Sequence, residues 1–359
     1  MYFGLTEEQE MLQETVRGFV ANECPPPKLR EIFDAGTGND PALWSGIVEM
    51  GLTGLVIPEE HEGAGMEMLE LALVSEILGG GAVPGPFTGH SLACLALVLG
   101  GSDEQKKTWL PKLATGECVG SIALAESADS WAPASWNTAL DGKKLTGTKQ
   151  YVPTADLADI LIVGTAGGGL ALVERNAAGV KLEAGGGIDQ TRPIFRLELG
   201  GAPCEALPCD AAVTQRVLDG GMVLLAADSF GAASELVRIS TEYAKTREQF
   251  GFPIGQFQAV KHQLARLATN IEPTRALFWY TAYAYDHVQD EAARYAPLTK
   301  AHITDTAMQT ARMAVELWGG LGFTWECDVQ MWFKRAMFNR AFLGTPETLR
   351  ERCAALAGW

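Results

Sequence analysis

A short stretch between two helical patterns carries the residues best suited to bind a phosphate. Residues 243–258 read YAKTREQFGFPIGQFQ, and the glycines and proline in the middle form a turn signature. Arg247 lies at this corner, with Gln249 and Gln256 close by in the sequence. A guanidinium fixed there suits a diphosphate, to which the two amides can donate hydrogen bonds. The alternative is that Arg247 caps carbonyl groups at the end of a helix.

Two amphipathic helices must position this corner. Apolar residues follow a helical pattern from Met222 up to it, and a second such pattern starts beyond it at Phe257. Val260, Leu264 and Leu267 then share one helical face. We therefore expect two helices that meet at the corner.

The first part of the chain has the pattern of helices alone. Thr6 and Ser102 each begin a capping box, with a glutamine three residues on, and so predict helix starts. Prolines 25–27 predict the end of the first helix, and the next helix is expected to start near Pro41. Further helices are expected over residues 66–78, 92–99 and 103–113.

From Cys118 the pattern changes to short β-branched and apolar runs separated by glycines. Residues 195–199 alternate apolar and charged side chains, as in a half-buried strand. Other strands are expected over residues 122–124, 151–152, 160–163 and 170–173. The helical pattern returns after Val213, and a final helix is expected to start at Thr345, Pro346 and Glu347.

The predicted fold class is therefore α+β, in three consecutive domains. We expect an N-terminal helical domain over residues 1–117, a small antiparallel β-domain over 118–212 and a C-terminal helical domain over 213–359. The glycine pairs do not form a GxGxxG motif between a strand and a helix, so no nicotinamide-binding fold is expected.

Composition and charge argue against several classes of protein. The formal net charge of −16 is opposite to that of a nucleic-acid-binding surface. No apolar run is long enough to span a bilayer, and the N-terminus lacks a signal pattern, so no membrane association is expected. The 7 cysteines are scattered without a CxxC pair, which argues against zinc and a disulfide framework and favours a reducing cytoplasm.

Several motifs closely resemble those of the acyl-CoA dehydrogenase family of flavoproteins. The corner sequence TREQFGFPIGQFQAVKHQLA is similar to the family's helix–turn–helix signature, and residues 58–65, PEEHEGAG, resemble its PEExGGxG loop. Gly147–Lys149 with Ala158–Asp159 resembles its GxK…AD pattern. Residues 318–326, WGGLGFTWE, resemble its glycine loop, and the GFTWE ending is most similar to the branch that oxidises CoA thioesters of steroid side chains.

The resemblance implies a reaction in which a glutamate removes a proton next to the thioester and a flavin accepts a hydride. The family keeps this glutamate in one of two places, which correspond here to Leu343 and to about Gly221. Neither residue can accept a proton. Asp219 is shorter and displaced along the helix, and Glu347 corresponds to a residue that contacts the cofactor.

The resemblance also implies an FAD that lies across two subunits. One subunit holds the flavin ring, but here Ala125–Ser130 replaces the TEPxxGSD loop and Tyr151–Thr154 replaces the W-[IS]-T-N strand, where Pro153 removes a backbone donor. The neighbouring subunit contacts the diphosphate and adenine. The candidate cofactor-binding residues are Arg247, Gln249, Phe250, Gln256, Phe257, Glu316, Gly319, Gly320 and Thr345. Of these, Glu316 replaces a glutamine of the family, and its carboxylate is unfavourable beside a diphosphate unless a cation offsets it.

These features favour the non-catalytic subunit of a heterotetrameric acyl-CoA dehydrogenase. It would complete the FAD site of a homologous catalytic subunit that oxidises an acyl-CoA or steroid-CoA, with an electron-transfer flavoprotein as electron acceptor. Two alternatives stay open: a self-sufficient homotetramer with a displaced base, and a structural subunit without flavin. Trp318, Trp325 and Trp332 are candidates for a broad substrate pocket, although tryptophans at such spacings more often belong to the core.

Overall fold

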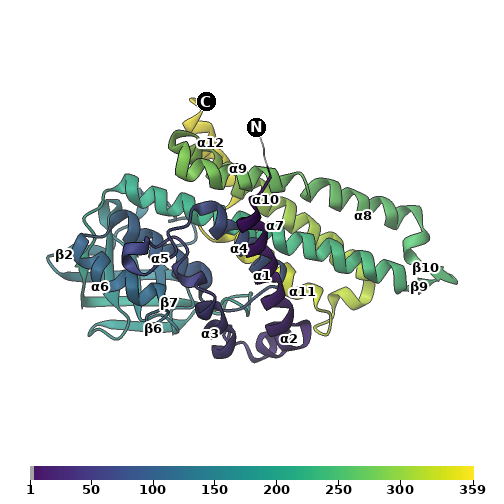
Figure 1. Ribbon diagram of the computed structural model, residues 1–359, viewed down its shortest axis with the longest axis horizontal. Coiled ribbons are helices and arrows are strands. Elements are labelled where there is room, and N and C mark those ends of the chain that lie inside the picture. The colour runs from purple at the N-terminus through teal and green to yellow at the C-terminus, as the bar shows by residue number, and fades with distance from the viewer. Residues whose placement is uncertain (1–3) are drawn as a thin grey trace. The chain divides into compact units, whose positions relative to one another are not determined.

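The computed structural model describes residues 4–359, whose contacts divide the chain into two compact units (Figure 1). The first, which we call the helical unit, comprises the described part of Met1–Phe33 together with Ala72–Val83 and Met222–Trp359. The second, which we call the sheet unit, comprises Asp34–Leu71 and Pro84–Gly221. The division into three domains near residues 117 and 213 stays a prediction.

Helices form most of the described chain. In chain order, the α-helices are α1 (Glu7–Glu23), α2 (Pro26–Ala35), α3 (Pro41–Glu49), α4 (Met68–Gly80), α5 (Phe87–Gly100), α6 (Asp103–Ala114), α7 (Ala211–Thr246), α8 (Gln258–Ile271), α9 (Thr274–His287), α10 (Gln289–Trp318), α11 (Val329–Ala341) and α12 (Pro346–Leu356). In the helical unit, α10 packs against α8, α9, α11 and α12 (Figure 1).

The helix starts follow the capping chemistry expected from the sequence. Thr6 and Gln9 exchange hydrogen bonds between side chain and backbone at the start of α1, and Ser102 does the same with Gln105 at α6. The expectation of a non-helical segment between residue 25 and Pro41 is wrong, because α2 begins at Pro26. Proline suits the first turn of a helix, where a backbone N–H has no intrahelical acceptor.

The sheet unit contains two sheets of four strands each, together with α3, α5, α6 and the start of α7. The first sheet has the order β1 (Gly120–Ala123), β4 (Ile160–Gly164), β5 (Leu170–Glu174) and β8 (Glu205–Ala206). The second has the order β2 (Ala139–Asp141), β3 (Lys144–Pro153), β7 (Ile194–Pro203) and β6 (Val180–Ala184). All pairs are antiparallel except β1 with β4, which the long connection through β2 and β3 allows to run parallel.

The register of the second sheet breaks near the end of β3. The pairing of β3 with β7 shifts between Lys149 and Val152, and Tyr151 takes a φ of 58° at this bulge. Such a bulge redirects the side chains next to it. Val152 itself stays fully buried in the core between the sheets.

Two glycines allow helices α4 and α7 to touch backbone to backbone in the helical unit. A Cβ atom on Gly79 would lie 2.1 Å from the Asp228 carbonyl oxygen, and one on Gly231 would lie 1.8 Å from the Glu76 carbonyl oxygen. No side chain fits at either position without separating the helices.

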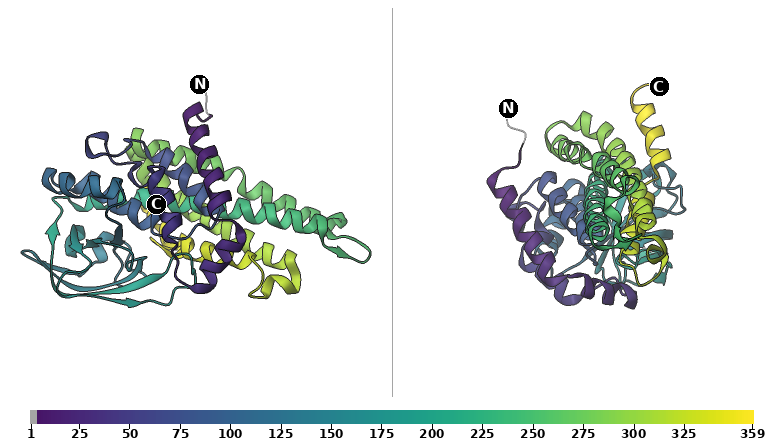
Figure 2. Two further views of the ribbon diagram at one scale, coloured as in Figure 1. Left: turned by 60° about the horizontal axis from the view of Figure 1, so that its bottom comes forward. Right: turned by 90° about the vertical axis from the view of Figure 1, so that its right-hand side faces the viewer.

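A short β-hairpin connects helices α7 and α8. Strands β9 (Glu248–Gln249) and β10 (Phe252–Pro253) pair through two residues each, and the hairpin projects beyond the helices that it joins (Figures 1 and 2). Among residues 4–359, no helix has the length and apolar character needed to cross a membrane. The same residues contain no cluster of His, Cys, Asp or Glu side chains arranged to hold a metal ion.

Replacing Gly231 with alanine tests the close helix crossing. We expect Gly231→Ala to lower the free energy of unfolding by about 1–3 kcal/mol or more, because the new methyl group meets a backbone carbonyl that cannot move alone. Gly18→Ala adds the same methyl group to α1 in open space and should stabilise the helix by about 0.5–1 kcal/mol. Denaturant unfolding of both variants measures the difference, and equal effects would contradict the crossing.

Candidate functional site

A stacked pair of aromatic rings brings the predicted phosphate corner and the glycine loop together. Tyr243 on α7 and Trp318 on α10 stack with ring centroids 4.1 Å apart and an interplanar angle of 8°. Arg247 follows one helical turn after Tyr243, whose carbonyl accepts its N–H at 2.8 Å. Gly319 follows Trp318 directly. The stack therefore places two sequence-distant candidates for diphosphate contact beside one another.

Arg247 is an available cation at this corner. Arg247 is exposed, and its guanidinium has neither a hydrogen-bond partner nor an ion-pair partner among residues 4–359. Its backbone carbonyl accepts the N–H of Ile254 at 2.7 Å, which fixes the start of the turn. Lys245, by contrast, donates to Glu242 at 2.7 Å. Arg247 is thus better placed than its basic neighbour to bind an anion.

The other predicted residues of the hairpin are also exposed to solvent. Gln249 donates to the carbonyl of Glu248 at 2.8 Å, and Gln256 is exposed. Phe250 is 89% exposed with a φ of 55°, and its ring meets that of Phe257 edge to face at 6.0 Å. A phenylalanine that projects into water in a strained backbone conformation is costly unless it contacts another molecule.

The glycine loop leaves open space next to the corner. Gly319 has a φ of 63°, which favours glycine, and a Cβ atom on Gly320 would meet nothing within 4 Å. Packing inside the chain therefore does not explain the glycine at 320. Glu316 is exposed one helical turn earlier on α10. The free guanidinium of Arg247 and this open loop fit a diphosphate, with the Glu316 carboxylate as the one unfavourable group.

Thr345 lies away from this corner. Lys300 on α10 donates to the carbonyl of Gly344 at 2.6 Å, and Lys300 precedes Trp318 by 18 residues, about 27 Å along the helix. Thr345 is the N-cap of α12 and accepts a hydrogen bond from the N–H of Thr348. The structure thus separates the predicted cofactor residues of one chain into two places.

Neither predicted base position holds a proton acceptor. Leu343 is 1% exposed and takes a φ of 61°, so its apolar side chain fills the turn before α12. Gly221 is a buried residue of α7, and Asp219 nearby is 4% exposed with its carboxylate accepting from Gln215. Glu347 pairs with Arg340 at 2.5 Å. The carboxylates of Asp219 and Glu347, which are the candidates for a displaced base, therefore both have hydrogen-bonding partners.

The loop at 125–130 satisfies its own polar groups. Ser130 Oγ accepts the N–H groups of Glu126 at 2.6 Å and Ser127 at 2.7 Å. The Glu126 carboxylate accepts from Lys149 at 2.9 Å and from the backbone and hydroxyl of Thr138 at 2.8 Å. Burial alone would raise the pKa of Glu126, but these hydrogen bonds lower it to about 2. This ion pair stays formed at neutral pH.

The strand at 151–154 offers a flavin ring few partners. Tyr151 stacks on Trp131 with ring centroids 6.1 Å apart, both in the sheet unit. Thr154 has a φ of 45° and a buried hydroxyl with no hydrogen-bond partner among the described residues. In the neighbouring loop, by contrast, the N–H groups of Glu126 and Ser127 are occupied by Ser130 Oγ.

Sequence reasoning did not anticipate the buried lysine at the Leu343 turn. Lys300 is fully buried, and burial lowers its pKa to about 7, helped by Arg340 and opposed by Asp305. It also donates to the carbonyl of Arg340 at 3.3 Å. The available signal was its helical spacing from buried apolar residues on both sides, four before and three after it, at Ala296 and Ile303.

Fold and site together define an α+β protein with an exposed cationic corner and no proton acceptor at either expected base position. Residues 6–117 and 211–357 match the models for the N-terminal and C-terminal domains of acyl-CoA dehydrogenases. The acyl-CoA dehydrogenase IpdE2 of Mycobacterium tuberculosis is 32% identical over 347 residues, which are 96% of each chain. The chain therefore belongs to the acyl-CoA dehydrogenase family.

Two solved structures share the fold over nearly their whole length. The Tcur3481-Tcur3483 steroid ACAD, in its G363A variant, matches with a TM-score of 0.90 at 30% identity over 98% of both chains. A chain of the ChsE4-ChsE5 complex from Mycobacterium tuberculosis matches with a TM-score of 0.89 at 25% identity, over 100% of this chain and 99% of that one. The predicted α+β fold and the resemblance to the steroid branch of the family are confirmed.

Lys300 gives the stability of the protein a pH dependence that can be measured. The folded pKa of about 7 lies below the ordinary value of about 10.4, so the unfolded chain binds the extra proton between these pH values. Wild-type stability should therefore rise relative to that of Lys300→Met as the pH increases from about 7 to about 10. Below pH 7 the difference should level off.

The control for this measurement is a solvent-exposed lysine. Lys245 has a side chain that is 63% exposed, and Lys245→Met should change the slope of stability against pH very little over the same range. Thermal midpoints of the three proteins at matched ionic strength provide the readout. A slope for Lys300→Met that equals the wild-type slope would show that Lys300 is not buried with a lowered pKa.

Proposed function

We propose that this chain is the non-catalytic subunit of a heteromeric, FAD-dependent acyl-CoA dehydrogenase. It lends Arg247 and the loop at Gly319 and Gly320 to a flavin held mainly by a homologous catalytic subunit. The observation that carries the proposal is the contrast within one chain: an available guanidinium beside an open glycine loop, and a leucine and a glycine where the family keeps its base.

Proton abstraction needs a group within hydrogen-bond reach of the carbon next to the thioester. Leu343 cannot perform it, and the carboxylate of Glu347 is engaged by Arg340. The flavin supplies the hydride acceptor wherever it is bound. This chain's part is therefore to bind and orient: Arg247 offers a planar, permanently charged donor to a diphosphate, and Phe250 offers exposed apolar area next to it.

Two similar solved structures support a second, homologous subunit as the partner and a steroid-CoA as the substrate. One similar structure is a complex of two differently named chains and another is a steroid ACAD, which supports a heterotetramer acting on a steroid-CoA. An electron-transfer flavoprotein would accept the electrons. The seven cysteines all lie within the described residues and none forms a disulfide, which supports a location in the cytoplasm.

Removing the guanidinium should lower the flavin content of the assembled complex. In Arg247→Ala we expect flavin to bind about tenfold or more weakly, as for a lost hydrogen bond to a charged group. Lys245→Ala is the matched control, because its ammonium is already engaged by Glu242. Flavin absorbance per protomer after extensive dilution and concentration measures both. Equal flavin retention in Arg247→Ala and wild type would remove the assignment.

The amount of flavin per chain and the dehydrogenase activity distinguish a non-catalytic subunit from a self-sufficient homotetramer and from a flavin-free structural subunit. We expect this chain, purified with a co-expressed homologue that carries the glutamate, to contain about half a flavin per chain and to oxidise steroid-CoA in preference to straight-chain acyl-CoA. Purified alone, it should show no dehydrogenation. Full flavin occupancy with turnover by the isolated chain would establish a homotetramer with a displaced base. A complex without flavin would establish a structural subunit.

A further inference from the structure

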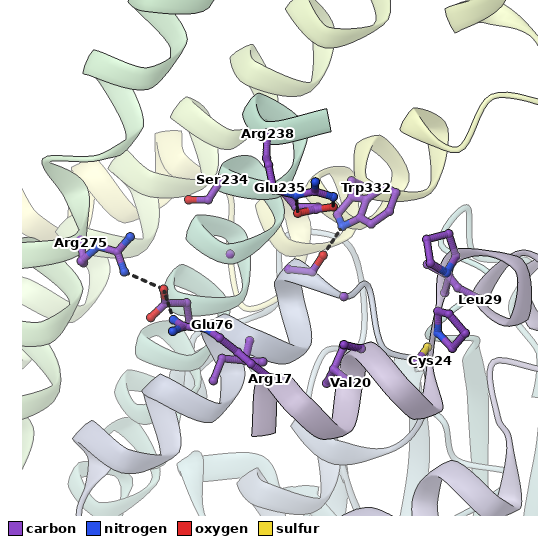
Figure 3. A pocket seen from close by; sticks show the side chains of 17 residues that line it. Arg17, Val20, Cys24, Leu29, Glu76, Ser234, Glu235, Arg238, Arg275 and Trp332 are labelled. Carbon is purple, nitrogen blue, oxygen red and sulfur yellow. Dashed lines mark hydrogen bonds and ion pairs between the residues drawn. The ribbon is translucent and has the colours of Figure 1, made fainter. Parts of the chain in front are cut away.

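A cleft within the helical unit lies apart from every residue assigned to flavin or base. It has a volume of about 570 Å³, within the range of small-molecule sites. Its walls come from α1, the start of α2, the end of α4, the middle of α7, and single residues of α9 and α11 (Figure 3). Arg238 in its lining precedes Arg247 by nine residues, about 14 Å along α7.

Charged side chains line the cleft in two places, and their carboxylates are already engaged (Figure 3). Glu76 accepts from Arg275 at 2.9 Å and from Gln13 at 3.4 Å, and lies 3.9 Å from Arg17 (Figure 3). Glu235 binds Arg238 through two hydrogen bonds of 2.7 and 2.6 Å. Neither carboxylate is left to bind a cationic ligand.

Arg17 is the arginine of the cleft that is least engaged with carboxylates of the described chain. Arg275 also binds Glu272, at 3.1 Å, and Arg238 donates to Glu235 from Nε and from one of its two terminal nitrogens. Arg17 has only the long contact with Glu76, and its side chain is 52% exposed. A ligand carboxylate could therefore bind to Arg17 without breaking a strong ion pair.

A serine hydroxyl in the lining has no partner. Ser234 Oγ is shielded from water and forms no hydrogen bond within residues 4–359. Buried polar atoms are rarely left without a partner, so this one calls for an explanation. Because no water-sized group reaches this oxygen, it is closed to a ligand as well, and the polar recognition in the cleft rests on Arg17.

Apolar side chains line another part of the cleft wall. Val20, Ile77 and Leu29 line it together with two prolines at the start of α2 and glycines at the end of α4. The indole of Trp332 completes the wall and is fixed by its donation to the Gly80 carbonyl at 2.8 Å (Figure 3). Against such a wall, a rigid apolar ligand loses less conformational entropy on binding than a flexible chain does.

From this geometry we infer that the cleft binds an organic monoanion with a rigid polycyclic body, whose carboxylate pairs with Arg17 while its apolar face lies against Trp332 and Val20. The site is distinct from the proposed flavin corner, and its occupancy does not depend on flavin or on a catalytic base. The inference therefore stands or fails separately from the proposed function.

Calorimetric titration of the full-length chain with cholate, in the assembly in which it is purified, tests the inference. Cholate carries one carboxylate on a rigid four-ring body. We expect it to bind, with an affinity about tenfold or more lower in Arg17→Gln and largely kept in Arg17→Lys. Ala21→Phe should abolish binding, because Ala21 lines the cleft and its exposed position tolerates a larger side chain.

The matched control for the blocking variant is Asn22→Phe. Asn22 is the exposed neighbour of Ala21 on α1 and does not line the cleft, so cholate affinity should stay at the wild-type value. Acetate supplies the charge without the apolar body and should bind at least a hundredfold more weakly than cholate. The inference is overturned if wild type does not bind cholate, if Ala21→Phe and Arg17→Gln both bind it normally, or if acetate binds equally well.

Discussion

A buried ion pair between Asp228 on α7 and Arg335 on α11 holds together the helices that carry the functional residues of the helical unit. Both residues are at most 3% exposed, and the shortest of their hydrogen bonds is 2.6 Å. Removing two charges from water is costly, and the cost is offset only when the remaining donors and acceptors are satisfied. Here Asn339 donates to Asp228 and Arg335 donates to the Val83 carbonyl. The positions of Arg247 at the end of α7 and of Trp332 on α11 depend on this network.

The turn before α12 combines a strained backbone with contacts that offset the strain. Leu343 takes a backbone conformation that a leucine avoids, and its burial together with the bond from Lys300 to Gly344 offsets the strain. The hydrogen bond from Lys300 goes to the backbone carbonyl of Gly344, so it does not depend on the residue type at 343.

The two regions considered for flavin contact differ in whether their polar groups are already paired within the chain. In the sheet unit, Glu126 pairs with Lys149, and Ser130 Oγ accepts two N–H groups of its own loop. In the helical unit, the Arg247 guanidinium lacks a partner among residues 4–359, and Phe250 contacts Phe257 yet stays 89% exposed. One region is complete by itself, and the other is suited to contact with a second molecule.

Much of the fold was predictable because its signals are local. Capping boxes at Thr6 and Ser102, the alternation at residues 195–199 and the turn residues after Thr246 each act within a few positions. The helix α2 was missed for a local reason as well, since a run of prolines predicts both the end of one helix and the first turn of another. Family motifs then supplied the order of the elements.

The sequence by itself determined which residue types stand at the positions considered for chemistry: Arg247, Gly319 and Gly320 at the proposed diphosphate corner, and Leu343 and Gly221 at the two expected base positions. Only the tertiary structure decided which of them lie together. It joined Arg247 to the glycine loop through the Tyr243–Trp318 stack, separated Thr345 from both, and buried Lys300. It also formed the cleft beside Arg17 from six helices. These outcomes depend on contacts between residues tens to hundreds of positions apart, which no local pattern of side chains encodes.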